Sequence, residues 1–186
     1  MKRIILSVFA TVVALAVNAQ GVQRLQLNEK TNKVTFSQVV ENLEKDKVTL
    51  FSDVQSWIAL SFKSGEAVTD LADQNAGKFI LKPIAILPMN STVSLECKYL
   101  LTITIKDGKA RIVIDNIHCD NSLINGVPNS SAGWGTPEEW LEGKANGYKQ
   151  KPAKLDNVAN LVADNMELLL QSFENAIKQK IEDEDW

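Results

Sequence analysis

The side chains best suited to chemistry lie near one another in the middle of the chain. They are two cysteines, Cys97 and Cys119, and the only histidine, His118. A cysteine thiolate beside an imidazole can act as a nucleophile, and the same residues can bind a metal ion. A zinc site with two histidines is excluded because the chain has one. A lone histidine at a strand end is more often structural, and we favour that interpretation for His118.

The spacing of the two cysteines leaves their oxidation state open. Apolar and polar residues alternate on the strand that precedes a strong hairpin-turn signal, Asp107-Gly108. A two-residue turn there sets Cys97 opposite His118 and leaves Cys119 on the other face. A bulge near Asn116 would bring the two cysteines together. The alternatives are therefore a Cys97–Cys119 disulfide and two buried free thiols.

The acidic residues give weaker indications of catalysis. Glu138 and Glu139 fall in the first turn of a predicted helix, where the helix dipole favours carboxylates. Asp70, Asp73 and Asp115 fall at strand or turn positions, where we expect them to be solvated. Glycoside hydrolysis requires two carboxyl groups that face each other across a cleft, and spacing in the sequence does not establish this.

Three aromatic residues, Trp134, Trp140 and Tyr148, lie in a segment otherwise rich in Asn, Ser, Gly and Pro. Exposed aromatic side chains commonly anchor protein partners or sugars, so these three are the candidates for binding. The alternative is that Trp134 and Trp140 hold a long loop against the sheet, since long loops in compact domains usually pack.

The composition argues against several classes of function. The formal net charge is −3 and lysines are interspersed with acids, whereas a nucleic-acid-binding protein presents a basic stripe. Asp120, Asn121, Asn125 and Asn129 lack the ligand spacing of a calcium loop. Gly133-Trp134-Gly135 lacks the lysine of a phosphate-binding loop. We therefore predict no metal, no cofactor and no nucleic-acid partner.

The first 19 residues have the order of a secretory signal peptide. Lys2 and Arg3 precede an apolar run, 4–17, and Val17 and Ala19 supply the small residues of a cleavage site. The run is shorter than the roughly 20 residues that a membrane-spanning helix needs. No cysteine follows the cut, so we expect no lipid anchor. This segment predicts a periplasmic or secreted protein with no membrane insertion after cleavage.

Beyond the signal, the pattern predicts a polar leader at 20–32 and a single α+β domain over 33–186. Pro83 within a predicted strand indicates an edge or a bulge. Adjacent antiparallel strands with helices on one face make a two-layer domain with one open sheet face. The expected elements are a strand at 34–41, a helix capped by Thr49 or Ser52 and ended by Gly65, a hairpin of strands 67–72 and 78–87, a long hairpin at 93–118, a loop at 120–152 with one short helix after Thr136, and a helix at 155–181.

Several of these elements resemble a family of secreted bacterial proteins, a domain of unknown function with a TBP-like fold. The resemblance covers about 33–117 and implies a curved antiparallel sheet covered by helices. It implies neither an activity nor DNA binding, because function is argued from sites rather than folds. The motifs that carry it are the strand 34–40, the helix residues Leu50 and Ser56-Trp57-Ile58, the turn 75–78 and the hairpin 101–111.

These observations favour a non-catalytic binding or interaction module of the bacterial envelope. Its partner would be an envelope protein, a peptide or a glycan, bound at the open sheet face and by the segment from Trp134 to Tyr148. The alternative function is a hydrolase whose acid pair, or Cys-His pair, is assembled from residues distant in the sequence.

Overall fold

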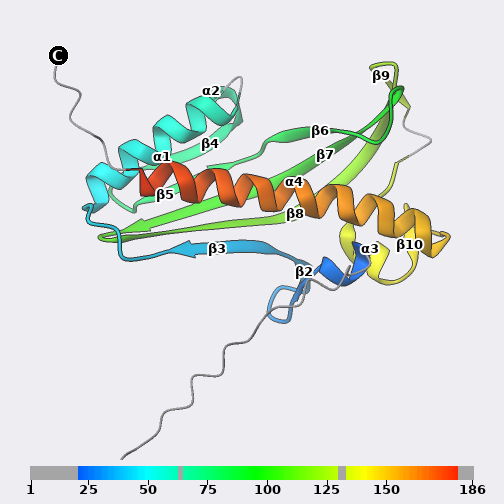
Figure 1. The fold of residues 1–186 in the computed structure, drawn as a ribbon, viewed down its shortest axis with the longest axis horizontal. Helices are drawn as coiled ribbons and strands as arrows, with labels where there is room; N and C mark the ends of the chain where they lie inside the picture. Colours follow the sequence, from blue (N-terminus) through cyan, green and yellow to red (C-terminus); the bar gives the residue numbers. More distant parts are fainter. Residues whose placement is uncertain (1–20, 63–64, 130–132, 180–186) are drawn as a thin grey trace, which may run out of the picture.

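A computed structural model describes residues 21–62, 65–129 and 133–179, and an antiparallel sheet of seven strands forms its centre (Figure 1). The strand order is β3-β8-β7-β5-β4, while β6 pairs with β7 and β9 pairs with β8. The predicted α+β architecture is confirmed. The strands are β3 (Phe36–Val40), β4 (Thr69–Asp73), β5 (Lys78–Leu81), β6 (Ile84–Pro88), β7 (Val93–Lys106), β8 (Lys109–Ile124) and β9 (Val127–Asn129).

The long hairpin of β7 and β8 forms the middle of the sheet. Gly108 in its turn has a φ of +71°, and Ile105 pairs with Ala110, as the Asp107-Gly108 signal predicts. Apolar and polar side chains alternate along β7, so that one face is buried in the core, with Ile103 fully buried. Pro83 interrupts the predicted return strand and divides it into β5 and β6, because proline donates no ladder hydrogen bond.

Farther along this hairpin, the register shifts on both sides of Lys98. Asn116 adopts a φ of +49° on β8, at the position where a bulge brings the cysteines together. Lys98 therefore pairs with His118, and Cys97 and Cys119 form a disulfide bond with their Cα atoms 4.2 Å apart. Both cysteines are fully buried. Because neither carries a thiol in this oxidised form, a Cys-His nucleophile is not available.

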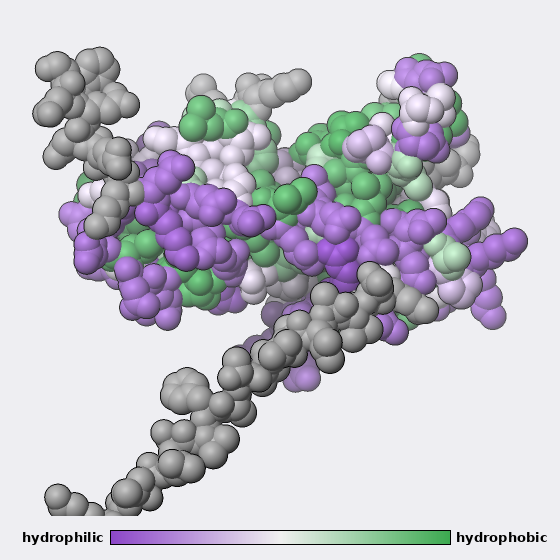
Figure 2. All heavy atoms as spheres, in the orientation of Figure 1, coloured by the Kyte–Doolittle hydropathy of each residue, from purple (hydrophilic) through white to green (hydrophobic). Residues whose placement is uncertain are grey.

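Two long helices, α1 (Lys47–Ser61) and α4 (Pro152–Lys178), pack on one face of the sheet (Figure 1). The apolar stripe of α4 is buried, and its Phe173 contacts Trp57 of α1 with ring centroids 5.2 Å apart. Figure 2 shows a hydrophilic surface along the outer side of α4 and apolar surface beside it, over β6 and β7. None of the described helices is long and apolar enough to cross a membrane.

The start of α1 differs from the sequence prediction. Its N-cap is Asp46, whose carboxylate accepts a hydrogen bond from the Thr49 backbone N–H at 2.8 Å, so the predicted caps Thr49 and Ser52 are wrong. This hydrogen bond lowers the pKa of Asp46. The prediction that Gly65 ends α1 is also wrong, because Gly65 begins a separate short helix, α2 (Gly65–Val68).

The expected polar leader packs against α4. A short 3-10 helix (Gly21–Arg24) begins the described chain, and its Arg24 forms ion pairs with Asp164 and Glu167 at 2.7 and 2.8 Å. Strand β1 (Leu27–Asn28) then pairs with β2 (Lys33–Val34). Residues 21–34 therefore belong to the folded unit. The expected signal peptide, 1–19, lies outside the described residues.

Candidate functional site

The segment expected as a loop at 120–152 is partly ordered by the sheet. β8 continues to Ile124 and pairs with β9 across an Asn125-Gly126 turn. Beyond β9, the Trp134 backbone N–H donates to the Cys119 carbonyl, and the Cys119 N–H donates to the Gly135 carbonyl, both at 2.8 Å. These two hydrogen bonds fix Trp134 beside the disulfide-bonded residue of β8.

Helix α3 (Pro137–Leu141), which forms where the sequence predicts it, anchors this segment in the core. Thr136 and Glu139 complete a capping box, in which the Glu139 carboxylate accepts from the Thr136 N–H at 2.9 Å. Trp140 is 1% exposed, and its indole N–H donates to the Trp134 carbonyl at 2.6 Å. Trp140 therefore does not face a ligand; it holds the segment in place and positions Trp134.

A small hairpin places the third predicted aromatic residue. Strands β10 (Lys144–Ala145) and β11 (Tyr148–Lys149) pair across Asn146-Gly147, whose φ values of +49° and +78° are those of a type I′ turn. The second oxygen of the Glu139 carboxylate accepts from the Gly147 N–H at 3.0 Å, which ties this hairpin to α3. Tyr148 follows the turn and is 74% exposed.

Trp134 and Tyr148 line one hollow of about 430 Å³, which we name the aromatic hollow. Trp134 is partly buried against the core, whereas Tyr148 extends into solvent. The end of the sheet contributes apolar residues to its lining, which we name the apolar wall, and polar residues complete it. The wall consists of Met89, Val93 and Ile124, and the polar residues are Asn146, Gln150 and Lys154.

This arrangement can hold a ligand that is part apolar and part polar. Aromatic rings stack on the apolar faces of sugars and on flat side chains, and carboxamides such as those of Asn146 and Gln150 both donate and accept hydrogen bonds. Lys154 adds a positive charge, and the exposed Lys149 and Lys151 lie close to it in the sequence. The hollow therefore offers stacking, hydrogen bonding and positive charge within one surface.

The acidic candidates from the sequence have mainly structural contacts. Glu138 accepts a hydrogen bond from the Val34 backbone N–H at 2.7 Å, and both carboxylate oxygens of Glu139 accept from backbone groups. Burial raises the pKa of Asp115, Lys33 opposes that rise, and the nearby Glu138 adds to it. Within the described ranges, no group of three or more His, Cys, Asp or Glu side chains could hold a metal ion.

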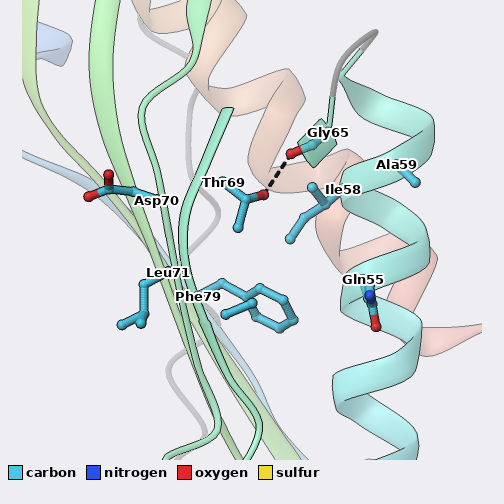
Figure 3. Close-up of a pocket in the computed structure, with 9 residues that line it drawn as sticks. Gln55, Ile58, Ala59, Gly65, Thr69, Asp70, Leu71 and Phe79 are labelled. Carbon is cyan, nitrogen blue, oxygen red and sulfur yellow. Dashed lines mark hydrogen bonds between the residues drawn. The ribbon is translucent and has the colours of Figure 1, made fainter. Parts of the chain in front are cut away.

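A second hollow, of about 610 Å³, lies between α1 and β4, and we name it the edge hollow (Figure 3). Gln55 and Ala59 line it from α1, and the buried Phe79 lines it from β5. Thr69 of β4 donates its hydroxyl to the Gly65 carbonyl at 2.7 Å. No motif in the sequence predicts a binding site here, because the hollow depends on the distance between α1 and the edge strand β4.

The apolar wall of the aromatic hollow was also missed. Met89 and Ile124 lie far from Trp134 in the sequence and meet it only because the β7–β8 hairpin extends beyond the disulfide. One local signal for the site was present. Asn146-Gly147 is a favoured type I′ turn sequence, and it would have placed Tyr148 at the start of a strand.

The fold and these sites define the class of protein as an α+β domain with a TBP-like fold, and comparison with solved structures agrees. A TBP-like protein from Parabacteroides distasonis matches with a TM-score of 0.67 and 17% identity, covering 84% of this chain and 98% of that one. A DUF4468 family protein from Bacteroides ovatus matches with a TM-score of 0.64 and 15% identity, covering 84% and 92%. At these identities the similarity shows the fold alone. No curated protein matches the chain.

Residues 36–120 match the family described as a domain of unknown function (DUF4468) with TBP-like fold. This matched segment runs from β3 into β8. The resemblance noted from the sequence is thereby confirmed for family and fold. The matched segment ends before Trp134, so the aromatic hollow is built largely from residues outside it.

Proposed function

We propose that this protein is a non-catalytic binding module of the bacterial envelope, which holds a peptide, glycan or protein segment in the aromatic hollow. The observation that carries the proposal is that Trp134 and Tyr148, 14 positions apart, line the same hollow beside Asn146, Gln150 and Lys154. Aromatic anchors surrounded by hydrogen-bonding groups are typical of binding surfaces.

The way the segment is fastened supports this proposal. Trp140, the capping box of α3 and the Gly147–Glu139 hydrogen bond hold the segment rigidly, while Tyr148 stays 74% exposed. A rigid framework reduces the entropy that is lost when a ligand binds. An aromatic side chain kept in solvent by such a framework is more useful for binding than for stability.

The location is part of the same proposal. The order of residues 1–19, basic, then apolar, then small, supports export to the periplasm or beyond. The buried Cys97–Cys119 disulfide is consistent with such a compartment, because disulfides form and persist under oxidising conditions. The net charge of −3 favours neither nucleic acid nor anionic lipid as a partner.

Site-specific photo-crosslinking in the host organism tests this function. A benzoylphenylalanine at position 148 would replace Tyr148 at the rim of the hollow, and the same residue at position 168 would replace the exposed Leu168 of α4 as a control. We expect a discrete crosslinked species from position 148 that is absent from position 168 and is lost when Trp134→Ala is added. The same crosslinks at both positions, or none at either, would rule the proposal out.

A further inference from the structure

Strand β4 lies at one edge of the sheet and β3 at the other, and the outer side of β4 is not paired with another strand in the described part of the chain. Three of its five residues, Asp70, Leu71 and Ala72, are exposed. An edge strand presents a row of backbone N–H and C=O groups that an additional strand can pair with. The edge hollow runs beside this strand, between β4 and α1.

The two sides of this edge differ in chemistry. Figure 3 shows Thr69 and Phe79 directed toward α1, and Asp70 on the opposite side of β4. A register shift between Thr69 and Leu71 marks Asp70 as the extra residue of a bulge. On the α1 side, the hollow is lined by the apolar Ile58, Ala59 and Phe79. On the other side, Figure 3 shows Asp70 and Leu71, and the strand register puts Asp73 on that side as well, opposite Lys78 of β5.

We propose that the edge hollow binds an extended segment of a partner protein, which adds to β4 as a further strand and alternates apolar with basic residues. Successive side chains of a strand point to opposite faces. The apolar residues of the added strand would enter the hollow beside Ala59, and its basic residues would lie near Asp70 and Asp73. Main-chain hydrogen bonds give affinity in this mode, and the alternating side-chain contacts give specificity.

Asp70 is available for this role. It pairs with Lys82 at 2.9 Å, and the two side chains are 52% and 65% exposed. A solvent-exposed pair of this kind contributes little to stability, so a basic residue of the added strand can take the place of Lys82 at small cost.

The same charges argue against a second copy of this chain as the occupant. Antiparallel pairing of β4 with β4 of another molecule would place Asp70 and Asp73 of both chains along one seam. Like charges facing each other across a strand pair are destabilising. The carboxylates therefore discourage self-association at this edge while favouring a basic partner.

A labelled peptide tests the proposal. The probe is a nine-residue fluorescein-labelled peptide of alternating valine and lysine, and its anisotropy is followed as the purified protein is added. Ala59→Trp fills the hollow from an exposed position of α1, and Leu60→Trp makes the same change at a neighbouring residue that does not line the hollow. We expect saturable binding that Ala59→Trp weakens at least tenfold and Leu60→Trp leaves unchanged.

Charge and backbone are tested separately. Asp70→Lys should weaken the lysine peptide at least tenfold and strengthen an alternating valine–glutamate peptide. Two further probes carry N-methyl groups on alternate residues, one on the odd-numbered and one on the even-numbered positions. One of these methylated peptides should lose binding and the other should keep it, because only one set of N–H groups faces β4. Tyr148→Ala should change nothing, which separates this site from the aromatic hollow.

Several results would overturn the proposal. They are the absence of saturable binding, equal affinity of the Ala59→Trp and Leu60→Trp variants, and equal binding of the two methylated peptides. A dimer in light scattering that Ala59→Trp dissociates would also overturn it, because the edge would then be occupied by a second copy.

Discussion

Reduction of the Cys97–Cys119 disulfide should lower the stability of the domain by a predictable amount. The bond joins residues separated by 22 positions, so it closes a loop of that size in the unfolded chain. The loop-entropy relation then gives about 3 kcal/mol of stabilisation. For a domain of this length, a loss of about 3 kcal/mol corresponds to a fall of about 6–12 °C in the melting temperature.

Thermal unfolding followed by circular dichroism measures this effect, with and without a phosphine reductant. The double variant Cys97→Ala/Cys119→Ala should melt near the reduced protein and should not respond to the reductant. Its melting temperature also includes the loss of two fully buried sulfur atoms, so it should not exceed that of the reduced protein. A reduced protein that melts at the same temperature as the oxidised one would refute the reasoning.

Three further predictions concern the framework of the aromatic hollow and one carboxyl group. Trp140→Ala should cost about 3–5 kcal/mol in urea unfolding, because the side chain is 1% exposed, and an unchanged midpoint would contradict its anchoring role. Gly135→Ala should also destabilise, by about 1–3 kcal/mol, since φ is +70° and a Cβ would lie 1.8 Å from a Glu139 oxygen; a neutral effect would be inconsistent with this geometry. The pKa of Asp115 is raised in the folded protein, so ionisation of this carboxyl group lowers the free energy of unfolding. This loss of stability is absent below the usual pKa of 3.8, grows as the pH rises toward the folded-state pKa, and is complete above it. Asp115→Asn should therefore raise the midpoint of urea unfolding at pH 7 and leave it unchanged at pH 3. A rise of the midpoint at pH 3 alone would contradict this prediction.

The centre of the fold could be predicted because its signals are local. The Asp107-Gly108 turn fixes the register of β7 against β8, and alternation along β7 then determines which face is buried. The capping box at Thr136 likewise places α3 correctly. In each case a short stretch of sequence forms the element, although β8 extends to Ile124, beyond the predicted end at 118.

Other features depend on contacts that the sequence does not reveal. The Asn116 bulge decides whether the cysteines meet, and asparagine adopts a positive φ in many contexts without forming a bulge. The cap of α1 was misplaced because Asp46, Thr49 and Ser52 are all residue types that can cap a helix, so the sequence alone does not distinguish them.

The sequence identified the aromatic residues of this segment but neither their separate roles nor the other residues of the hollow. Trp134, Trp140 and Tyr148 were identified together, yet burial separates them into a residue that fixes the segment and two that line a hollow. This separation depends on α3 turning Trp140 into the core. The edge hollow had no sequence signal, since it arises from the spacing between α1 and β4.

The most direct test of the binding function is fluorine NMR of protein labelled with 5-fluorotryptophan, titrated with a soluble envelope extract of the host. Trp134 lines the aromatic hollow, whereas Trp57 is buried between α1 and α4 and serves as an internal reference. We predict a saturable shift of the Trp134 resonance, no shift of Trp57, and loss of the response in Tyr148→Ala. A Trp134 resonance that does not move, or that moves equally in Tyr148→Ala, would contradict the proposed binding function.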